Sequence, residues 1–168
     1  ENLVGAINGG WAIAKELLQH ERGMISEIGR SIGGTVPGVE VIAQRYLGDE
    51  AGHIKDPVLR DTVTRHVMDD QAFALTLRRA AAESAAGAAA GGLSSMFKYY
   101  GTEQNKRKFE LILKLAGQRA LGWEGEDFSE EELLTCRTWL RSKGNSIEGG
   151  TSEIQLNVIA KRVLGLPD

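Results

Sequence analysis

Cysteine and histidine are scarce in this chain of 168 residues, which has one cysteine and three histidines. A single cysteine, Cys136, excludes an internal disulfide and is typical of a reducing compartment, so we expect a cytoplasmic protein. No histidine lies near it in sequence, which favours a packing role over that of a nucleophile. His20, His53 and His66 are widely separated and lack metal-ligand spacing, so no metal site is expected.

Long apolar runs and an excess of positive charge are missing as well. No uninterrupted apolar stretch approaches the roughly 18 residues of a membrane span. The net charge of -3 leaves no basic footprint for nucleic acid. The apolar fraction of 42% and the charged fraction of 26% are ordinary for a globular domain. We therefore expect one globular domain with no membrane span and no nucleic-acid partner.

The polar–apolar alternation of β-strands is also absent, and helical periodicity dominates. Stretch 39–46 fits a helix or a loop, and segment 80–92, nearly all Ala, Gly and Ser, is interpreted as a helix end plus a loop. Long helices with short connections and one apolar stripe each predict an all-α fold: an antiparallel, up-and-down four-helix bundle with an additional short C-terminal helix. Three predicted helices cover about residues 10–31, 93–116 and 129–143. Two others begin at about residues 57 and 151.

Capping signals fix three of these helix starts. Asp56-Pro57 combines an N-cap with a proline at the first helical position. Ser129–Glu132 has the pattern of a capping box. For the last helix Thr151 or Ser152 supplies the capping hydroxyl, and Ser152 with Gln155 also fits a capping box.

Two adjacent glycines, Gly149 and Gly150, precede Thr151, although a capped helix start needs neither. Glycine permits φ > 0 and lets another molecule approach the backbone closely. The free N–H groups of a first helical turn suit an anionic ligand. A plain turn followed by a cap is the simpler interpretation of this stretch alone.

Glu21 interrupts the apolar stripe of the first predicted helix. Burial raises the pKa of a carboxyl group towards neutrality, which makes Glu21 a candidate general base. A buried ion pair with a cation from another helix explains it equally well. The neighbouring Arg22 points about a quarter-turn away and, on periodicity alone, fits a solvated surface position. The stripe consists of Trp11, Ala14, Leu17, Leu18, Met24, Ile25 and Ile28.

Two motifs, LLQHER at Leu17–Arg22 and GGTSEIQ at Gly149–Gln155, together resemble the acyl-CoA dehydrogenase family. The ends of the chain, Glu1–Gly5 and Arg162–Pro167, agree with this. The resemblance covers nearly the whole chain, so residues 1–168 are interpreted as the family's C-terminal helical domain. A start without methionine or signal peptide fits a piece of a longer protein that also has an N-terminal helical domain and a middle β-domain.

The resemblance implies an FAD-dependent oxidoreductase of lipid metabolism that dehydrogenates an acyl-CoA thioester to the trans-2-enoyl-CoA in fatty acid β-oxidation. In the family a carboxylate removes the α-proton, a hydride passes from the β-carbon to the flavin, and the electrons go to an electron-transferring flavoprotein. It also implies a homo- or hetero-oligomer, a dimer or a homotetramer, that associates through the helical bundle. The piece alone is expected to be inactive.

The same resemblance assigns roles to individual residues. The backbone N–H of Gly149 is expected to hold the thioester oxygen as charge develops on it. Substrate contacts are expected from Gln19, His20, Arg22, Gly149 and Gly150, and FAD contacts from Thr151, Ser152 and Glu153.

The position of the catalytic base departs from the commoner family pattern. Many members have the catalytic glutamate where this chain has Gly149, while a smaller group has a small residue there and places the base at the position of Glu21. This chain has the second combination, so Glu21 is the expected base, with Glu148 a lower-ranked rival one residue out of register. The family's Arg–Phe–Gly segment, which grips the FAD of a neighbouring subunit, has no clean match at Arg45–Gly48.

Two other functions remain open. One is a non-catalytic helical partner subunit that completes a neighbour's flavin site and builds the oligomer. The other is a related flavoprotein oxidase or monooxygenase, against which the glycine stretch argues weakly. A carboxylate inside the apolar stripe favours the enzyme over the non-catalytic partner.

Overall fold

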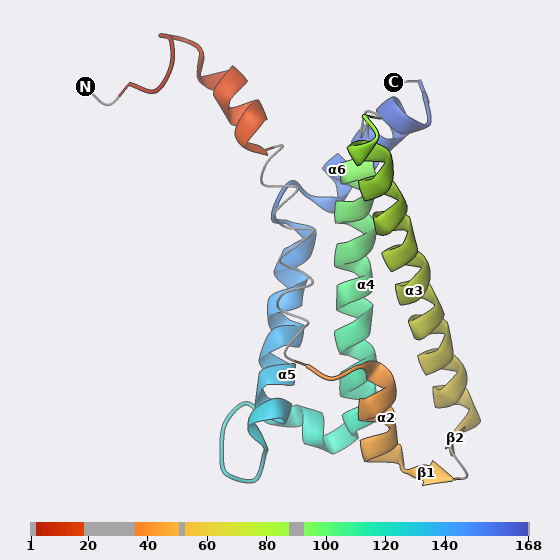
Figure 1. Cartoon of the computed structure of the whole chain (residues 1–168). Helices are drawn as coiled ribbons and strands as arrows, with labels where there is room; N and C mark the ends of the chain where they lie inside the picture. Colours follow the sequence, from red (N-terminus) through yellow and green to blue (C-terminus); the bar gives the residue numbers. More distant parts are fainter. Residues whose placement is uncertain (1–2, 19–35, 51–52, 88–92, 168) are drawn as a thin grey trace.

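The computed structural model describes residues 3–18, 36–50, 53–87 and 93–167, and most of them are helical (Figure 1). Residues 10–18 form an N-terminal helix. The further elements are α2 (Val39–Leu47), β1 (Asp49–Glu50), β2 (His53–Ile54), α3 (Pro57–Ala85), α4 (Leu93–Ala116), η1 (Gly117–Leu121), α5 (Glu130–Ser142), η2 (Lys143–Ser146), α6 (Ser152–Val158) and the π-helical η3 (Ile159–Val163).

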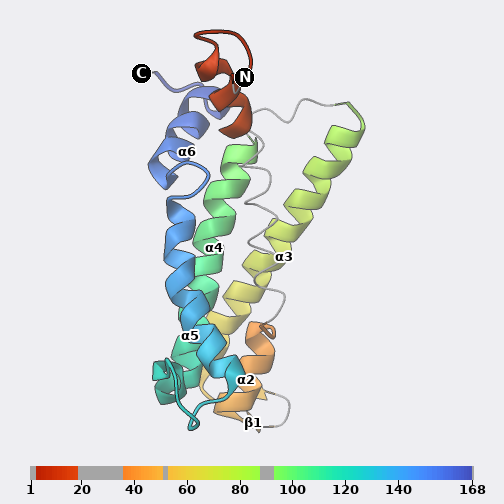
Figure 2. The same ribbon diagram turned by 90° about the vertical axis from the view of Figure 1, so that its left-hand side faces the viewer.

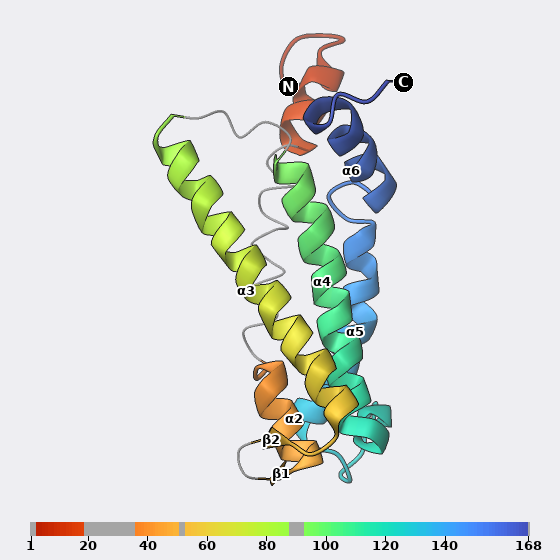
Figure 3. The same cartoon turned by 90° about the vertical axis from the view of Figure 1, so that its right-hand side faces the viewer.

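The three longest described helices, α3, α4 and α5, run side by side and alternate in direction (Figures 1 and 2). The short helix α2 packs at the end where α3 begins, and α6 lies at the opposite end (Figure 3). Within the described residues the only sheet is the antiparallel pair β1–β2, in which Asp49 is opposite Ile54. The all-α class is therefore confirmed, whereas the described residues do not establish a four-helix bundle.

Capping explains why the helices begin where they do. The Asp56 carboxylate accepts hydrogen bonds from the N–H groups of Val58 and Leu59, at 2.8 and 2.9 Å. Ser129 and Glu132 form the complete capping box at the start of α5. Both predicted starts are confirmed, and stretch 39–46, left open by the sequence, is helical as part of α2.

The start predicted near Thr151 is confirmed as well: Thr151 is the N-cap of α6, and its hydroxyl accepts a hydrogen bond from the Ile154 N–H. The alternative capping box is wrong, because Ser152 lies inside the helix.

The helix end interpreted for segment 80–92 is confirmed, since α3 ends at Ala85, and residues 88–92 lie outside the described residues. The alanines of this segment continue α3 as far as Ala85, because alanine has the highest helix propensity and the segment has no glycine before Gly87.

The apolar core occupies one end of the helical assembly. Buried side chains of α2, α3 and the second half of α4 meet there, and Phe109 is 0% exposed. The core residues are Val36, Val39, Ile42, Ala43, Ile54, Val63, Phe109, Leu111, Ile112 and Leu115. In the first half of α4 the buried residues are polar instead, namely Ser95, Lys98, Thr102 and Gln104. Polar groups are costly to bury without partners, so the buried polar residues in this half of α4 indicate a candidate functional site.

The N-terminal helix stands away from α3, α4 and α5 in Figure 1. Two residues of its apolar stripe are exposed in this chain, Trp11 at 71% and Leu17 at 66%. The stripe predicted for the first helix is therefore not buried at these positions. Residues 19–31 of that predicted helix lie outside the described residues.

A buried carboxylate joins α2, η1 and α5. Glu132 accepts hydrogen bonds from the Tyr46 hydroxyl at 2.9 Å and the Arg119 Nε at 2.8 Å, as well as from Ser129. Next to it, Arg45 pairs with Glu131 at 2.5 Å. Arg45 and Tyr46 thus fasten α2 to α5 in this chain.

We expect low pH to weaken the contacts of Glu132 that join α2, η1 and α5. Burial alone would raise the pKa of the Glu132 carboxyl, but hydrogen bonds from Ser129, Arg119 and Tyr46 outweigh it and lower the pKa to about 2. Because the pKa is depressed in the folded protein, the stabilisation is present above about pH 4.5 and is lost as the pH falls towards 2. We expect Glu132→Gln to lower the free energy of unfolding by about 3 kcal/mol at pH 7 and by much less at pH 2.5.

Urea unfolding of both proteins at the two pH values measures this difference. Glu124→Gln, on the exposed loop before α5, is the matched control and should change little at either pH. An equal loss for Glu132→Gln at pH 7 and pH 2.5 would contradict an electrostatic role.

Candidate functional site

The polar first half of α4 faces a turn formed by residues 148–151, which we call the glycine turn. Its two glycines have positive φ, 63° at Gly149 and 90° at Gly150, a backbone conformation that side-chain-bearing residues rarely adopt. Within the described residues the N–H groups of these two glycines make no hydrogen bond. The turn therefore presents two backbone donors that have no partner in the described part of the chain.

Gln155 fixes the carbonyl side of the glycine turn from α6. Its side chain is 0% exposed, and its Nε2 donates to the carbonyl oxygens of Gly149, at 2.9 Å, and Gly150, at 3.4 Å. A Cβ added to Gly150 would lie 2.8 Å from this Nε2. Close packing of Gln155 thus requires glycine at this position. Sequence reasoning missed this role because it assigned Gln155 to a capping box.

Glu148, the residue before the glycines, is held from two elements. Arg141 of α5 donates through Nη1 to Oε1 at 2.8 Å and through Nη2 to Oε2 at 2.7 Å, a bidentate ion pair. Asn145 of η2 donates to the same Oε1 at 2.8 Å. The Arg141 guanidinium is the main cause that lowers the pKa of Glu148, against the opposing effect of burial. A carboxylate of lowered pKa that accepts three hydrogen bonds is a poor general base.

Lys98 is the buried cation behind the glycine turn. It is 1% exposed, and its Nζ has no hydrogen-bond partner within the described residues. Burial lowers the pKa of the Lys98 ammonium, while the negative charges of Glu148 and Glu103 oppose that shift. Sequence reasoning gave Lys98 no role, because nothing in the local pattern predicts a buried lysine.

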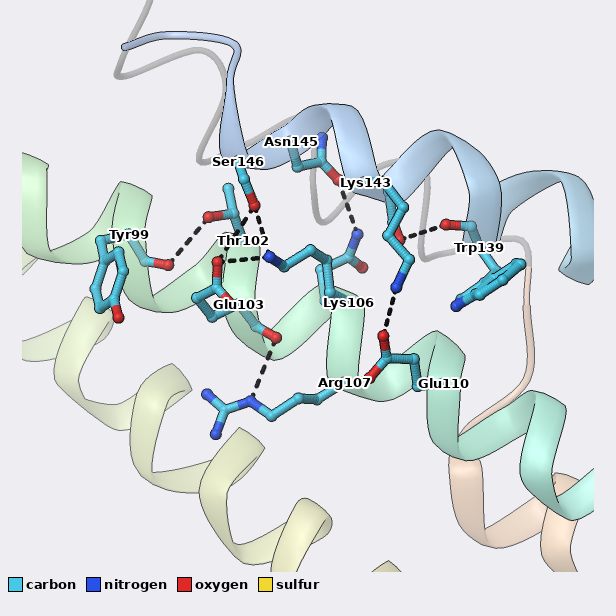
Figure 4. A network of polar contacts seen from close by, with 12 residues as sticks. Tyr99, Thr102, Glu103, Lys106, Arg107, Glu110, Trp139, Lys143, Asn145 and Ser146 are labelled. Carbon is cyan, nitrogen blue, oxygen red and sulfur yellow. Dashed lines mark hydrogen bonds and ion pairs between the residues drawn. The ribbon is translucent and has the colours of Figure 1, made fainter. Parts of the chain in front are cut away.

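A polar network fixes η2, the segment just before the turn, on α4 (Figure 4). Lys106 donates to the Ser146 hydroxyl at 2.6 Å and pairs with Glu103 at 2.7 Å. The adjacent Asn105 donates to Asn145 at 3.2 Å. Lys143 also pairs with Glu110 of α4. The start of the glycine turn is therefore anchored by several contacts between α4 and η2.

The structure places only part of the predicted site. Gly149, Gly150 and the following three residues come together at the turn and the start of α6. The Ser152 hydroxyl is buried without a partner within the described residues, whereas Glu153 is exposed. Hydrogen bonds from its own backbone N–H and from Thr151 lower the pKa of Glu153. The predicted base Glu21 lies outside the described residues, as do three of the five predicted substrate contacts, Gln19, His20 and Arg22.

A metal site and a membrane-spanning helix are both absent from the described part of the chain. No group of three or more His, Cys, Asp or Glu side chains there is arranged to hold a metal ion. No helix within the same residues is both long and apolar enough to cross a membrane.

Comparison with known proteins identifies relatives of this chain. A model of the family described as "Acyl-CoA dehydrogenase, C-terminal domain" matches residues 8–164. The chain is 30% identical to acyl-CoA dehydrogenase IpdE1 of Mycobacterium tuberculosis over an alignment of 170 residues that covers 98% of this chain and 40% of that protein. It is also 30% identical to acyl-CoA dehydrogenase FadE34 of the same organism, covering 99% of this chain and 21% of that protein. The chain thus spans less than half the length of these relatives.

Solved structures show the same fold. The acyl-CoA dehydrogenase from Geobacillus kaustophilus superposes with a TM-score of 0.72 at 20% identity, over 95% of this chain and 40% of that one. The structure titled "Tcur3481-Tcur3483 steroid ACAD G363A variant" gives a TM-score of 0.76 at 22% identity, over 98% of this chain and 42% of that one. With a family model that matches almost from end to end, the chain belongs to the acyl-CoA dehydrogenase family, as part of its C-terminal helical domain.

Proposed function

We propose that the protein containing this chain is an FAD-dependent dehydrogenase that converts an acyl-CoA thioester to the trans-2-enoyl-CoA, with residues 1–168 as its C-terminal helical domain. The observation that best supports this proposal is the glycine turn. Gly149 and Gly150 leave backbone N–H groups without partners in the described residues, while Gln155 holds their carbonyls. Free, oriented N–H donors are what stabilise an enolate oxygen as charge develops on it.

The start of α6 fits the expected flavin contact. The buried Ser152 hydroxyl has no partner within the described residues, and Thr151 and Glu153 flank it at the beginning of the helix. These three residues would hold part of FAD, which supplies the hydride acceptor of the reaction when bound. Because Ser152 is orphaned in the described part of the chain, an external hydrogen-bond partner is a consistent explanation.

Other residues of the chain are proposed to remove the α-proton and to align the substrate. Glu21 takes the α-proton, since Gly149 offers no carboxylate and Glu148 is paired with Arg141. The thioester oxygen is held by the Gly149 N–H, and Gly150 lines the same place. The acyl-CoA channel is completed by Gln19, His20 and Arg22.

The proposal extends to partners. An electron-transferring flavoprotein takes the electrons, and the subunits form a homo- or hetero-oligomer, a dimer or a tetramer, in the cytoplasm. The exposed Trp11 and Leu17 of the N-terminal helix support association, because large apolar side chains are seldom left in water without a partner surface.

A panel assay tests the proposed activity. The full-length protein is incubated with straight-chain, branched and steroid side-chain acyl-CoAs and an artificial electron acceptor, and enoyl-CoA is measured by mass spectrometry. Turnover of one class supports the proposal and gives the substrate. Bound flavin without turnover of any thioester would favour the non-catalytic partner subunit instead.

Substitution of Gly150 tests the turn itself. Gly150→Ala forces an alanine into φ 90° and places its Cβ 2.8 Å from Gln155 Nε2, so the turn must shift. A displacement of about 1 Å near the reacting atoms can cost about 100-fold in rate, and we expect kcat/KM to fall by about 10- to 100-fold. Steady-state kinetics on the best substrate of the panel measures the loss.

Gly87→Ala is the matched control for backbone strain. Gly87 also has a positive φ, 86°, but no atom of the described residues lies within 4 Å of an added Cβ. It should lower stability by a similar amount, about 1–2 kcal/mol, and leave kcat/KM unchanged. Equal kinetic losses in the two variants would mean that the loss reflects stability alone.

A further inference from the structure

We propose that Glu148 is a positioning residue, which through its ion pair with Arg141 fixes the glycine turn so that the Gly149 N–H is aimed at the thioester oxygen. This inference rests on the proposed function of the turn. The sequence made Glu148 a rival candidate for the catalytic base; in this inference it positions the turn instead.

The geometry of the pair supports positioning. Both carboxylate oxygens of Glu148 are engaged by Arg141, at 2.8 and 2.7 Å, so the side chain has one defined orientation. Asn145 adds a third contact at 2.8 Å. The position of Gly144 also matters, because a Cβ there would lie 3.0 Å from Arg141 Nη1. Glycine at 144 thus leaves room for the guanidinium to reach Glu148.

The residues that hold Glu148 are themselves fixed. Arg141 projects from the last turn of α5, and Asn145 belongs to η2, which is bonded to α4 through Asn105 (Figure 4). On the other side of the turn, Gln155 holds the Gly149 carbonyl at 2.9 Å. The two glycines, the most flexible residues of the segment, are therefore tied down at both ends.

Lys98 adds charge complementarity from α4. Its buried ammonium is attracted by the Glu148 carboxylate without a direct hydrogen bond within the described residues. Glu148 is thus ion-paired with Arg141 of α5 and also attracts the Lys98 ammonium of α4. Removal of its charge would leave Arg141 without its ion-pair partner and would weaken the attraction on Lys98, to which Glu103 also contributes.

The test uses the full-length protein with Arg141→Met, Glu148→Gln and the double variant. The first readout is amide hydrogen exchange of the turn, in particular the N–H groups of Ile147 and Glu148, which bond to the Gly144 carbonyl at 2.9 and 3.2 Å. We expect these amides to exchange about 5-fold faster in each single variant, the size of effect of a partly exposed ion pair. The melting temperature and the exchange of α3 should stay near wild type.

The second readout separates positioning from folding. Each single variant should lower kcat by about 10-fold and change KM by less than about 3-fold, since the donor is misplaced mainly for the transition state. The double variant should lose no more than either single one, because both changes break the same contact. Arg65→Met, which breaks the exposed Arg65–Asp61 pair of α3 at 2.8 Å, is the matched control and should leave both readouts unchanged.

Three results would overturn the inference. Unchanged exchange and kcat in Arg141→Met would show that the pair does not shape the turn. A loss of about 100-fold in Glu148→Gln beside a mild Arg141→Met would identify Glu148 as the base. Faster exchange with normal kcat would mean that the turn does not align the thioester. If the wild-type protein dehydrogenates no acyl-CoA, the proposed function fails, and the exchange data alone decide whether the pair fixes the turn.

Discussion

Replacement of Glu21 by glutamine in the full-length protein should lower kcat by at least about 100-fold, the lower range for loss of a general base. Glutamine keeps the size of the side chain but removes the basic oxygen. The proposal rests on the family resemblance at Leu17–Arg22 and on Gly149, which leaves the commoner base position without a carboxylate. Stopped-flow measurement of flavin reduction by the best acyl-CoA of the panel isolates the chemical step.

The accompanying measurements make this prediction specific. Flavin content and acyl-CoA affinity should change little in Glu21→Gln, because neither depends on the basic oxygen. Glu148→Gln, prepared alongside, should show the smaller loss expected of a positioning residue. Near-wild-type activity of Glu21→Gln together with a dead Glu148→Gln would show that the base is misassigned. Full activity of both would favour the non-catalytic partner.

Truncation of Phe109 should produce the largest loss of stability. Its ring is 0% exposed, in the core where α2 and α3 meet α4. We expect Phe109→Ala to lower the free energy of unfolding by about 3–5 kcal/mol, because it removes buried apolar surface and leaves a cavity. Urea unfolding followed by circular dichroism at 222 nm measures the change.

An exposed residue of similar character provides the control. Leu75 on α3 is 62% exposed, so Leu75→Ala should change the free energy of unfolding by no more than about 0.5 kcal/mol. Comparable losses in the two variants would mean that the core does not lie at the end of the assembly where Phe109 is buried.

Local signals in the sequence were sufficient to predict the helices and part of the candidate site. Asp56-Pro57 and Ser129–Glu132 cap α3 and α5 as predicted, because a cap needs only residues within one turn of the chain. The positive φ of Gly149 and Gly150 follows from residue type, since glycine lacks the Cβ that disfavours it. The family resemblance, confirmed by the match over residues 8–164, rests on short strings of the same kind.

Contacts between residues that are far apart in the sequence could not be predicted from such local signals. Gln155 fits a capping box in sequence, yet its amide turns to the carbonyls of Gly149 and Gly150, because Thr151 takes the cap and the turn folds back over α6. Likewise, Glu148 could serve as a base until Arg141 is found beside it.

The sequence by itself determined the all-α class, the starts of α3, α5 and α6 and the positive φ of the two glycines, since these depend on propensities and neighbours within a few residues. Only the tertiary structure decided that Lys98 is buried behind the turn and that Glu148 is held by Arg141. Which charges face one another depends on how α4 and α5 pack. That packing brings together side chains that no local pattern relates, such as Lys98 and Glu148.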